Sequence, residues 1–211
     1  MNRPPDIDGI PRLVPAGRTL YHAGDQATHA FYLHEGLVKL HADTWIGLHR
    51  GDHQQNTNRL IDLAGPTDVI GVHQSQHPHT AIAAVDTRVT IIPREHLTHP
   101  GNARAVIDHL ARANARAEAR LQQNDLPIPI RFLETLKDLA ARFGDATRPD
   151  ISFTLPLTIS DLAELANSSR GTITRLLADL QDRGVLEGRK GTYVLHTNAV
   201  ETYITDLIFD A

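Results

Sequence analysis

Residues 157–184 read LTISDLAELANSSRGTITRLLADLQDRG, and this stretch decides the fold of the chain. Thr158 stands where its hydroxyl can cap a helix that begins near Ser160, and Asp161 can complete the reciprocal hydrogen bonds of a capping box. The pattern therefore predicts a first helix of about two turns. Its apolar face consists of Leu162, Leu165 and Ala166.

A second helix is expected after a short turn. Asn167 and Ser168 favour turns and left-handed backbone, so the first helix should end there. Ser169 can cap the next helix, and Gly184 is a typical C-terminal stop. We predict this second helix over residues 169–183. Its apolar positions are Ile173, Leu176, Leu177 and Leu180.

The polar face of the second helix has the side chains of a DNA-reading element. Two short helices joined by a tight turn form a helix-turn-helix, whose second helix enters the major groove. Hydroxyl groups near the helix start can hold phosphates, and guanidinium groups can bond guanine edges. We therefore predict double-stranded DNA as a partner. The predicted contacts here are Thr158, Ser169, Arg170, Gly171, Thr172, Thr174 and Arg175.

Two short β-segments over residues 185–195 predict a wing after the helices. The tip between them is basic and flanked by glycines, which places Arg189 and Lys190 beside the DNA phosphates. The alternative is an amphipathic helix pair inside an all-α core, because helix pairs are common and the turn signal is short. The wing favours the DNA-binding interpretation.

Composition excludes several classes of protein. The chain has 211 residues, of which 41% are hydrophobic, and this suffices for packed cores. No apolar run approaches the roughly 20 residues of a membrane span, and the first residues lack an apolar secretory core, so we expect a cytoplasmic protein without a membrane partner. The absence of cysteine excludes disulfides and thiolate metal sites. The net charge of −4 is unusual for a DNA-binding protein, but a local basic patch matters more than the sum. That patch comprises Arg170, Arg175, Arg183, Arg189 and Lys190.

Short β-segments dominate the first half of the chain, from about residue 12 to residue 93. Proline and glycine separate them, and several short strands in succession imply a sandwich or barrel. The candidate strands cover residues 13–21, 30–34, 36–41, 44–48, 58–63, 69–72, 80–85 and 88–93, with a turn at 23–25.

One long helix is predicted from about residue 101 to Asn124, where the sequence becomes rich in alanine and arginine. Apolar residues recur there at alternating three- and four-residue steps, as in a coiled-coil seam, and an asparagine inside the seam can fix its register. We expect two copies of the chain to pair here as a homodimer. The alternative is a helix packed only on its own β-domain. The seam consists of Ile107, Leu110, Asn114, Ala117 and Leu121.

Pro127 and Pro129 break this helix and predict a hinge. A further helix over residues 131–143 and a strand over residues 151–155 should precede the helix-turn-helix. The fold class is therefore α+β, with a β-domain over 1–100, a dimerisation helix and hinge over 101–126, and a winged helix-turn-helix domain over 127–211.

This arrangement resembles the cyclic-AMP receptor protein/FNR family of bacterial transcription regulators over nearly the whole chain. The most similar stretches are residues 21–25 (YHAGD), 31–40 (FYLHEGLVKL), 65–71 (GPTDVIG) and 169–177 (SRGTITRLL). The resemblance implies a jelly-roll effector domain of the cyclic-nucleotide-binding type and winged domains on the two half-sites of a pseudo-palindrome. It also implies a transcription activator that contacts RNA polymerase and is not an enzyme. Arg170 and Arg175 fall at family DNA-contacting positions.

Two segments depart from the family pattern. Val72 stands where a ribose-binding glutamate is expected, and His79-Thr80 replaces the arginine pair that holds the cyclic phosphate. Because a fixed cation and a bidentate fork are missing, we expect DNA binding without cyclic AMP. In the recognition helix, Gly171 replaces the common glutamate, so the preferred half-site should differ at one base pair. The candidate effector-pocket residues are Gly71, Val72, His79, Thr80 and Arg116.

Histidines are concentrated in one part of the chain, with twelve of the thirteen between His22 and His109. They can be haem or metal ligands, which would make this a haem-, metal- or other small-molecule-dependent regulator of the same family. They can equally be exposed loop residues, since the tight paired spacing of a zinc site is missing. We predict no cofactor and no metal ligand. Two alternatives remain: a cupin-like metalloprotein built on His77 and His79, and a regulatory module in which the wing and helix contact only proteins.

Overall fold

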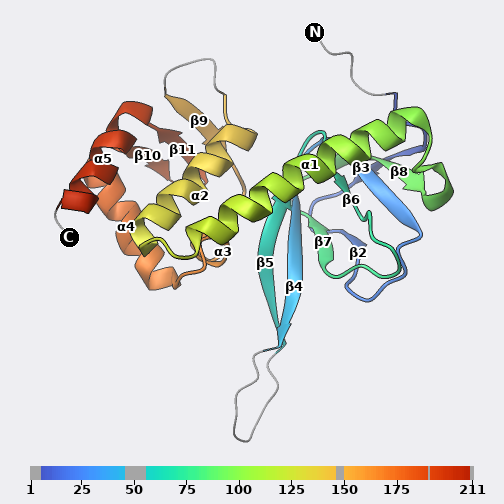
Figure 1. The fold of residues 1–211 in the computed structure, drawn as a ribbon, viewed down its shortest axis with the longest axis horizontal. Helices are drawn as coiled ribbons and strands as arrows, with labels where there is room; N and C mark the ends of the chain where they lie inside the picture. The colour runs from blue at the N-terminus through green and yellow to red at the C-terminus, as the bar shows by residue number, and fades with distance from the viewer. Residues whose placement is uncertain (1–5, 46–55, 146–149, 190, 210–211) are drawn as a thin grey trace, which may run out of the picture. The chain divides into compact units, whose positions relative to one another are not determined.

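A computed structural model describes residues 6–45, 56–145, 150–189 and 191–209 (Figure 1). The chain divides into two compact units, residues 1–117 and 118–211, called here the N-terminal and C-terminal units. The mixed α+β prediction is confirmed, and the three-part division into domains stays a prediction. Within the described ranges, no helix has both the length and the apolarity that a membrane span requires.

The N-terminal unit contains two four-stranded antiparallel sheets (Figure 1). Their strand orders are β1-β8-β3-β6 and β2-β7-β4-β5. One core cluster joins Leu33 and Val89 of the first sheet to Val38 and Ala81 of the second, so the core lies between the sheets and confirms the predicted β-roll. The strands are β1 (Ile10–Val14), β2 (Thr19–Tyr21), β3 (His29–Glu35), β4 (Val38–Trp45), β5 (Asn56–Ala64), β6 (Val69–Ile70), β7 (Thr80–Ala83) and β8 (Thr87–Pro93).

Residues 13–21 form two strands, and the prediction of a single strand was wrong. Pro15 has no N–H for a ladder, and Gly17 adopts a φ of 77°, which is a left-handed conformation that favours glycine. The chain turns there, so that β1 pairs with β8 while β2 pairs with β7 of the other sheet. Of the strand predicted at 44–48, residues 46–48 lie outside the described residues.

The long helix α1 (Pro100–Gln123) is confirmed, preceded by the short 3-10 helix η1 (Arg94–His96). Ala105 on its buried side packs with Ala30 and Tyr32 of the β-domain. The five predicted seam residues lie on another side of α1 and are all exposed. The exposed fractions of the large ones are 65% for Ile107, 48% for Leu110 and 69% for Leu121. The described part of the chain therefore leaves an apolar stripe on α1 uncovered.

The C-terminal unit packs four helices with a three-stranded sheet of order β10-β11-β9. α2 begins at Ile128 and not at the predicted Arg131, because Pro129 fits the first helical turn, where no N–H donor is needed. The C-terminal helix α5 was not predicted. The elements are α2 (Ile128–Phe143), β9 (Ile151–Thr154), α3 (Ile159–Leu165), α4 (Arg170–Asp182), β10 (Leu186–Arg189), β11 (Thr192–Leu195) and α5 (Thr197–Phe209).

Candidate functional site

The start of α3 has the capping box that the sequence predicts. The hydroxyl oxygen of Thr158 accepts a hydrogen bond from the Asp161 N–H at 3.1 Å, and the Asp161 carboxylate accepts one from the Thr158 N–H at 2.7 Å. These bonds satisfy two backbone donors that the helix itself leaves unpaired. After α3, Asn167 adopts a φ of 50°, which turns the chain toward α4. The predicted helix-turn-helix is therefore present.

The recognition helix α4 separates an apolar face from a polar one. Ser169 caps it by accepting a hydrogen bond from the Thr172 N–H at 3.1 Å. The apolar residues Ile173, Leu177 and Leu180 are buried, which fixes the orientation of the helix in the unit. The other face presents two guanidinium groups and hydroxyls within two turns of the helix start. These residues are Arg170, Gly171, Thr174 and Arg175, which are exposed, and Thr172, which is half-buried.

Arg131 of α2 is hydrogen-bonded to the turn between α3 and α4. Its Nε donates to the carbonyl of Ala166 at 2.9 Å, and a terminal nitrogen donates to the carbonyl of Asn167 at 3.2 Å. Another terminal nitrogen donates to the carbonyl of Asn124 at 3.1 Å. The two carbonyls that directly follow α3 thus receive donors that the helix itself does not supply. This role of Arg131 could not be predicted from local sequence patterns, since Arg131 lies 35 residues from Ala166.

The wing forms as a β10–β11 hairpin with Gly188 opposite Tyr193. A Cβ on Gly188 would lie 2.1 Å from the carbonyl oxygen of Thr192, so only glycine fits there. The Gln181 side chain of α4 donates to the Gly188 carbonyl at 2.7 Å and ties the wing to the recognition helix. Arg189 is exposed beside the hairpin tip, whereas Lys190 lies outside the described residues.

Arg183 has a different role from the other basic residues near it. Its Nε lies 3.1 Å from the Asp179 carboxylate, a terminal nitrogen lies 3.6 Å from Asp206, and the guanidinium sits over the Tyr203 ring. These contacts hold the Arg183 side chain in place, so it is not free to turn toward a ligand. The exposed basic groups of the described interface that have no such acidic neighbours are Arg170, Arg175 and Arg189.

In the β-domain, an aromatic cluster occupies the region of the predicted effector pocket. The Tyr21 hydroxyl and Nε2 of His79 share a hydrogen bond of 2.8 Å, and the Tyr21 ring stacks on His77 at 3.8 Å between centroids. His73 meets His77 and His79 edge-on at 5.7 and 5.3 Å. Burial, aided by the neighbouring His73 and His77, lowers the pKa of His79 to about 4. His79, a predicted effector-pocket residue, is therefore neutral at pH 7.

The other predicted pocket residues have separate surroundings. Gly71 lies beside His77, because a Cβ added to it would be 3.3 Å from the His77 ring. Val72 packs against a second core cluster around Tyr32 and Ala105. The Thr80 hydroxyl accepts a hydrogen bond from the Ala23 N–H at 3.0 Å. The structure thus brings Gly71 to the histidine cluster and directs Val72 to a different core.

Arg116 of α1 faces two carboxylates of the β-domain. Its nitrogens lie 3.9 Å from Asp62 and 3.9 Å from Asp68, and its side chain is 15% exposed. Nδ1 of His109 lies 3.0 Å from the same Asp68 carboxylate. Burial raises the pKa of Asp68, but hydrogen bonds from His109 and the Gly65 N–H, together with the charge of Arg116, outweigh burial and hold the pKa below its ordinary value. Arg116 therefore has acidic partners within its own unit.

Comparison with known proteins supports both the β-domain and the helix-turn-helix described above. The cyclic nucleotide-binding domain family matches residues 11–99, and the Crp-like helix-turn-helix domain family matches residues 130–202. A Mycobacterium tuberculosis protein described as a CRP-like cAMP-activated global transcriptional regulator is 28% identical over 187 residues, covering 83% of this chain and 80% of its own length. The chain belongs to the CRP/FNR family. It is a DNA-binding transcription regulator of the CRP/FNR type.

Two further proteins are similar to this CRP/FNR regulator, one in sequence and one in fold. The Cyclic AMP receptor protein of Thermus thermophilus is 27% identical, with 86% of this chain and 81% of that protein covered. The structure of FixK2 from Bradyrhizobium japonicum superimposes with a TM-score of 0.74 at 18% identity and covers 92% of this chain and 96% of its own. The second likeness concerns the fold alone. The two sequence relatives are described as a transcriptional regulator and as a cyclic AMP receptor protein.

The histidine cluster gives the CRP/FNR regulator an expected pH dependence. The unfolded chain binds protons at His79 near the ordinary pKa of about 6.5, whereas the folded protein resists protonation until about pH 4. We therefore expect the free energy of unfolding of the β-domain to fall as pH drops through this window. Urea unfolding followed by fluorescence of the single tryptophan, Trp45 of β4, measures it.

The control for this pH effect uses two glutamine variants. His79→Gln should make the dependence between about pH 6.5 and 4 shallower, because one of the titrating groups is gone, whereas His73 and His77, whose pKa values burial also lowers, still contribute. His29→Gln should keep it, since His29 is exposed on β3. Identical slopes for wild type and His79→Gln would show that His79 does not carry the effect.

Proposed function

We propose that this protein is a homodimeric transcription activator that binds a pseudo-palindromic DNA site without cyclic AMP. The DNA-reading surface would consist of the exposed face of α4 and the wing. On the described residues, its base contacts would come from Arg170 and Arg175, and its phosphate contacts from Thr158, Ser169 and Arg189. Thr172 and Thr174 lie on the same face, Gly171 leaves room for a base edge, and Lys190 would extend the wing's phosphate contacts.

The dimer would form along the exposed stripe of α1. An apolar stripe of this length is unusual on a surface that meets only water, and its three- and four-residue spacing suits a second copy of the same helix. Asn114 within the stripe would fix the register of the pair. Two recognition helices related by a two-fold axis would then reach successive major grooves, with half-site centres about 10 bp apart.

The proposed independence from cyclic AMP rests on one observation. The Tyr21 hydroxyl is hydrogen-bonded to His79, and both side chains are uncharged at pH 7. A buried cyclic phosphate needs a matched positive charge, and a histidine with a pKa of about 4 carries none at pH 7. The Thr80 hydroxyl already accepts a backbone hydrogen bond, and the Arg116 guanidinium faces Asp62 and Asp68. Each unpaired polar atom of the nucleotide would cost about 1–3 kcal/mol.

A regulator without a nucleotide ligand must rest in its DNA-competent arrangement, because a ligand that does not bind cannot shift a population. Control would then come from the amount of protein or from another effector. Activation would follow if the DNA-bound dimer contacts RNA polymerase beside the promoter, as the family resemblance implies.

Calorimetry and DNA binding test cyclic-nucleotide independence together. A specific DNA fragment is first selected from genomic DNA by gel shift, and its Kd is measured with and without cyclic AMP and cyclic GMP. We expect no binding heat at micromolar nucleotide and operator Kd values that agree within about twofold. The Mycobacterium tuberculosis relative, whose name describes cAMP activation, serves as the positive control. Micromolar heat together with a nucleotide-dependent gain in operator affinity would overturn the proposal.

A further inference from the structure

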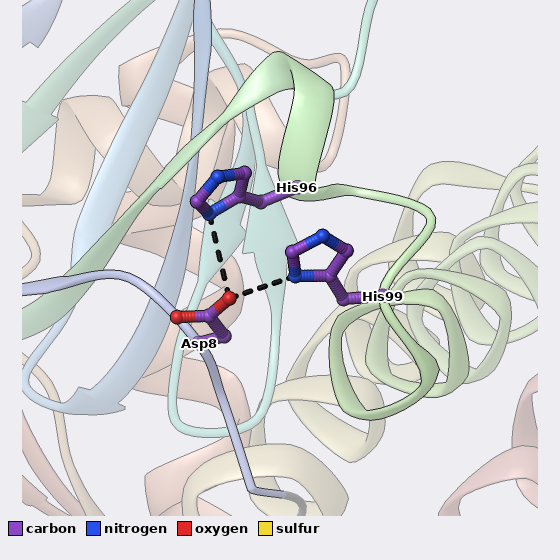
Figure 2. A group of neighbouring side chains, drawn as sticks. All are labelled: Asp8, His96 and His99. Carbon is purple, nitrogen blue, oxygen red and sulfur yellow. Dashed lines mark hydrogen bonds and ion pairs between the residues drawn. The ribbon is translucent and has the colours of Figure 1, made fainter.

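Three potential metal ligands from distant parts of the chain meet at the start of α1. Figure 2 shows the imidazole rings of His96 and His99 each directing one nitrogen toward the Asp8 carboxylate. Nδ1 of His99 lies 2.7 Å, and Nδ1 of His96 3.4 Å, from the same oxygen, Oδ2 of Asp8. The two rings stack with centroids 4.5 Å apart. One ligand atom from each residue lies within 4.8 Å of the other two.

A buried asparagine holds the backbone of this group in place. Asn102, which is fully buried, accepts a hydrogen bond from the Asp8 N–H and donates to the carbonyls of Asp8 and His96, all at 2.9 Å. The N–H of His99 donates to the His96 carbonyl at 3.1 Å and closes the turn between the two histidines. The backbone that carries the three side chains is therefore held in place before any ligand arrives, which lowers the entropic cost of binding.

Nδ1 of His96 is available for coordination, whereas Nδ1 of His99 is hydrogen-bonded to the Asp8 carboxylate. Nδ1 of His96 is shielded from water, and among the described residues it has no hydrogen-bond partner that satisfies the usual geometry. Its neighbour at 3.4 Å is the carboxylate oxygen, which already contacts His99. A buried polar atom without a partner is costly, and a metal ion between the three groups would satisfy it.

The ligand set identifies the class of cation. Two imidazole nitrogens and one carboxylate oxygen suit zinc and similar divalent transition metals, whereas magnesium and calcium prefer oxygen ligands alone. Tetrahedral zinc with bonds near 2.1 Å separates its ligand atoms by about 3.4 Å, so small side-chain rotations would give the required spacing. The side chains are 39–58% exposed, which gives an ion access and leaves a fourth position for water.

We propose that Asp8, His96 and His99 bind one divalent transition-metal ion per chain. The ion would link the segment before β1 to the turn that leads into α1, and so stabilise the N-terminal unit. This site is separate from the histidine cluster around Tyr21, and it does not depend on the proposed DNA-binding function.

Zinc titration of the full-length protein tests the site directly. The protein is purified without a histidine tag, freed of metal, and titrated with Zn²⁺ against a chromophoric zinc chelator. We expect one ion per chain, and at least about tenfold weaker binding for Asp8→Asn and His99→Ala. His29→Ala is the matched control, since it removes an exposed histidine of the same unit and should leave the affinity unchanged. Mg²⁺ should not compete.

A second readout separates metal binding from a purely structural cluster. Zn²⁺ should raise the Tm of the wild type and of His29→Ala by several degrees, and it should have little effect on Asp8→Asn and His99→Ala. Circular dichroism confirms that each variant is folded. Failure of wild type to bind Zn²⁺, or equal affinity in Asp8→Asn and His99→Ala, would overturn the proposal. So would a site lost in His79→Gln and retained in His99→Ala, because binding would then belong to the other cluster.

Discussion

If the proposed dimer forms along α1, Leu110→Glu is expected to convert it into monomers and to weaken operator binding by about 100-fold or more. Leu110 lies in the middle of the exposed stripe on α1, between Ile107 and Asn114. In a paired helix a glutamate there would be buried against its own copy, and the two like charges would repel in a poorly hydrated seam. A monomer contacts only one half-site, so the gain from simultaneous binding of two is lost. Sedimentation and gel shift measure the two effects.

Ala119→Glu is the matched control for the seam variant. Ala119 is exposed on the same helix, nine residues from Leu110 and so about 180° around the helix axis. The added charge should meet water, and the dimer and its operator Kd should both be retained. A dimer of unchanged stability in Leu110→Glu would remove the stripe from the proposed interface.

Arg170→Ala and Arg175→Ala are each expected to lower specific DNA affinity by about 1–3 kcal/mol, which is roughly 5- to 150-fold. Both side chains project from the exposed face of α4, where a guanidinium can bond O6 and N7 of one guanine. Non-specific binding should change much less, because phosphate contacts supply most of it. Titration of the selected operator and of an unrelated fragment at one fixed salt concentration gives both values.

Arg189→Ala is the control that distinguishes contacts to DNA bases from contacts to phosphates. Arg189 lies on the wing and should contact phosphates, so its loss should weaken all sequences alike and reduce the slope of affinity against salt by about one unit. If Arg170→Ala left the ratio of specific to non-specific affinity unchanged, its assignment to a base would be wrong. The same titration tests Gly171→Glu, which has open space at its Cβ and should alter the preferred base pair.

Local chemistry made much of the C-terminal unit predictable. The capping box of Thr158 and Asp161 and the cap of Ser169 are decided by residues three positions apart, so each can be identified from sequence alone. Apolar spacing likewise located α1 and α4 to within a residue or two. The turn at Pro15 and Gly17 was missed, although both residues favour turns, because the surrounding sequence has strong strand preferences.

Contacts between distant residues could not be predicted in the same way. The pairing of Tyr21 with His79 depends on how β2 and β7 meet, and spacing along the chain does not report it. The hydrogen bond from Arg131 to the turn after α3 likewise joins residues that are far apart in the sequence. The sequence placed His79 near the effector region through family resemblance, but its neutral state follows from burial, which only the folded structure reveals.

The hydrogen bonds between Asn102 and Asp8 also limit when the β-domain can finish folding during synthesis. The two residues are 94 positions apart, and at 5–20 residues per second the ribosome needs about 5–19 seconds to make the intervening chain. Over most of that time β8, the strand that pairs with β1 among the described residues, has not been made. The β-domain therefore closes late, as the first turn of α1 emerges, and its first strand must stay soluble and unpaired until then.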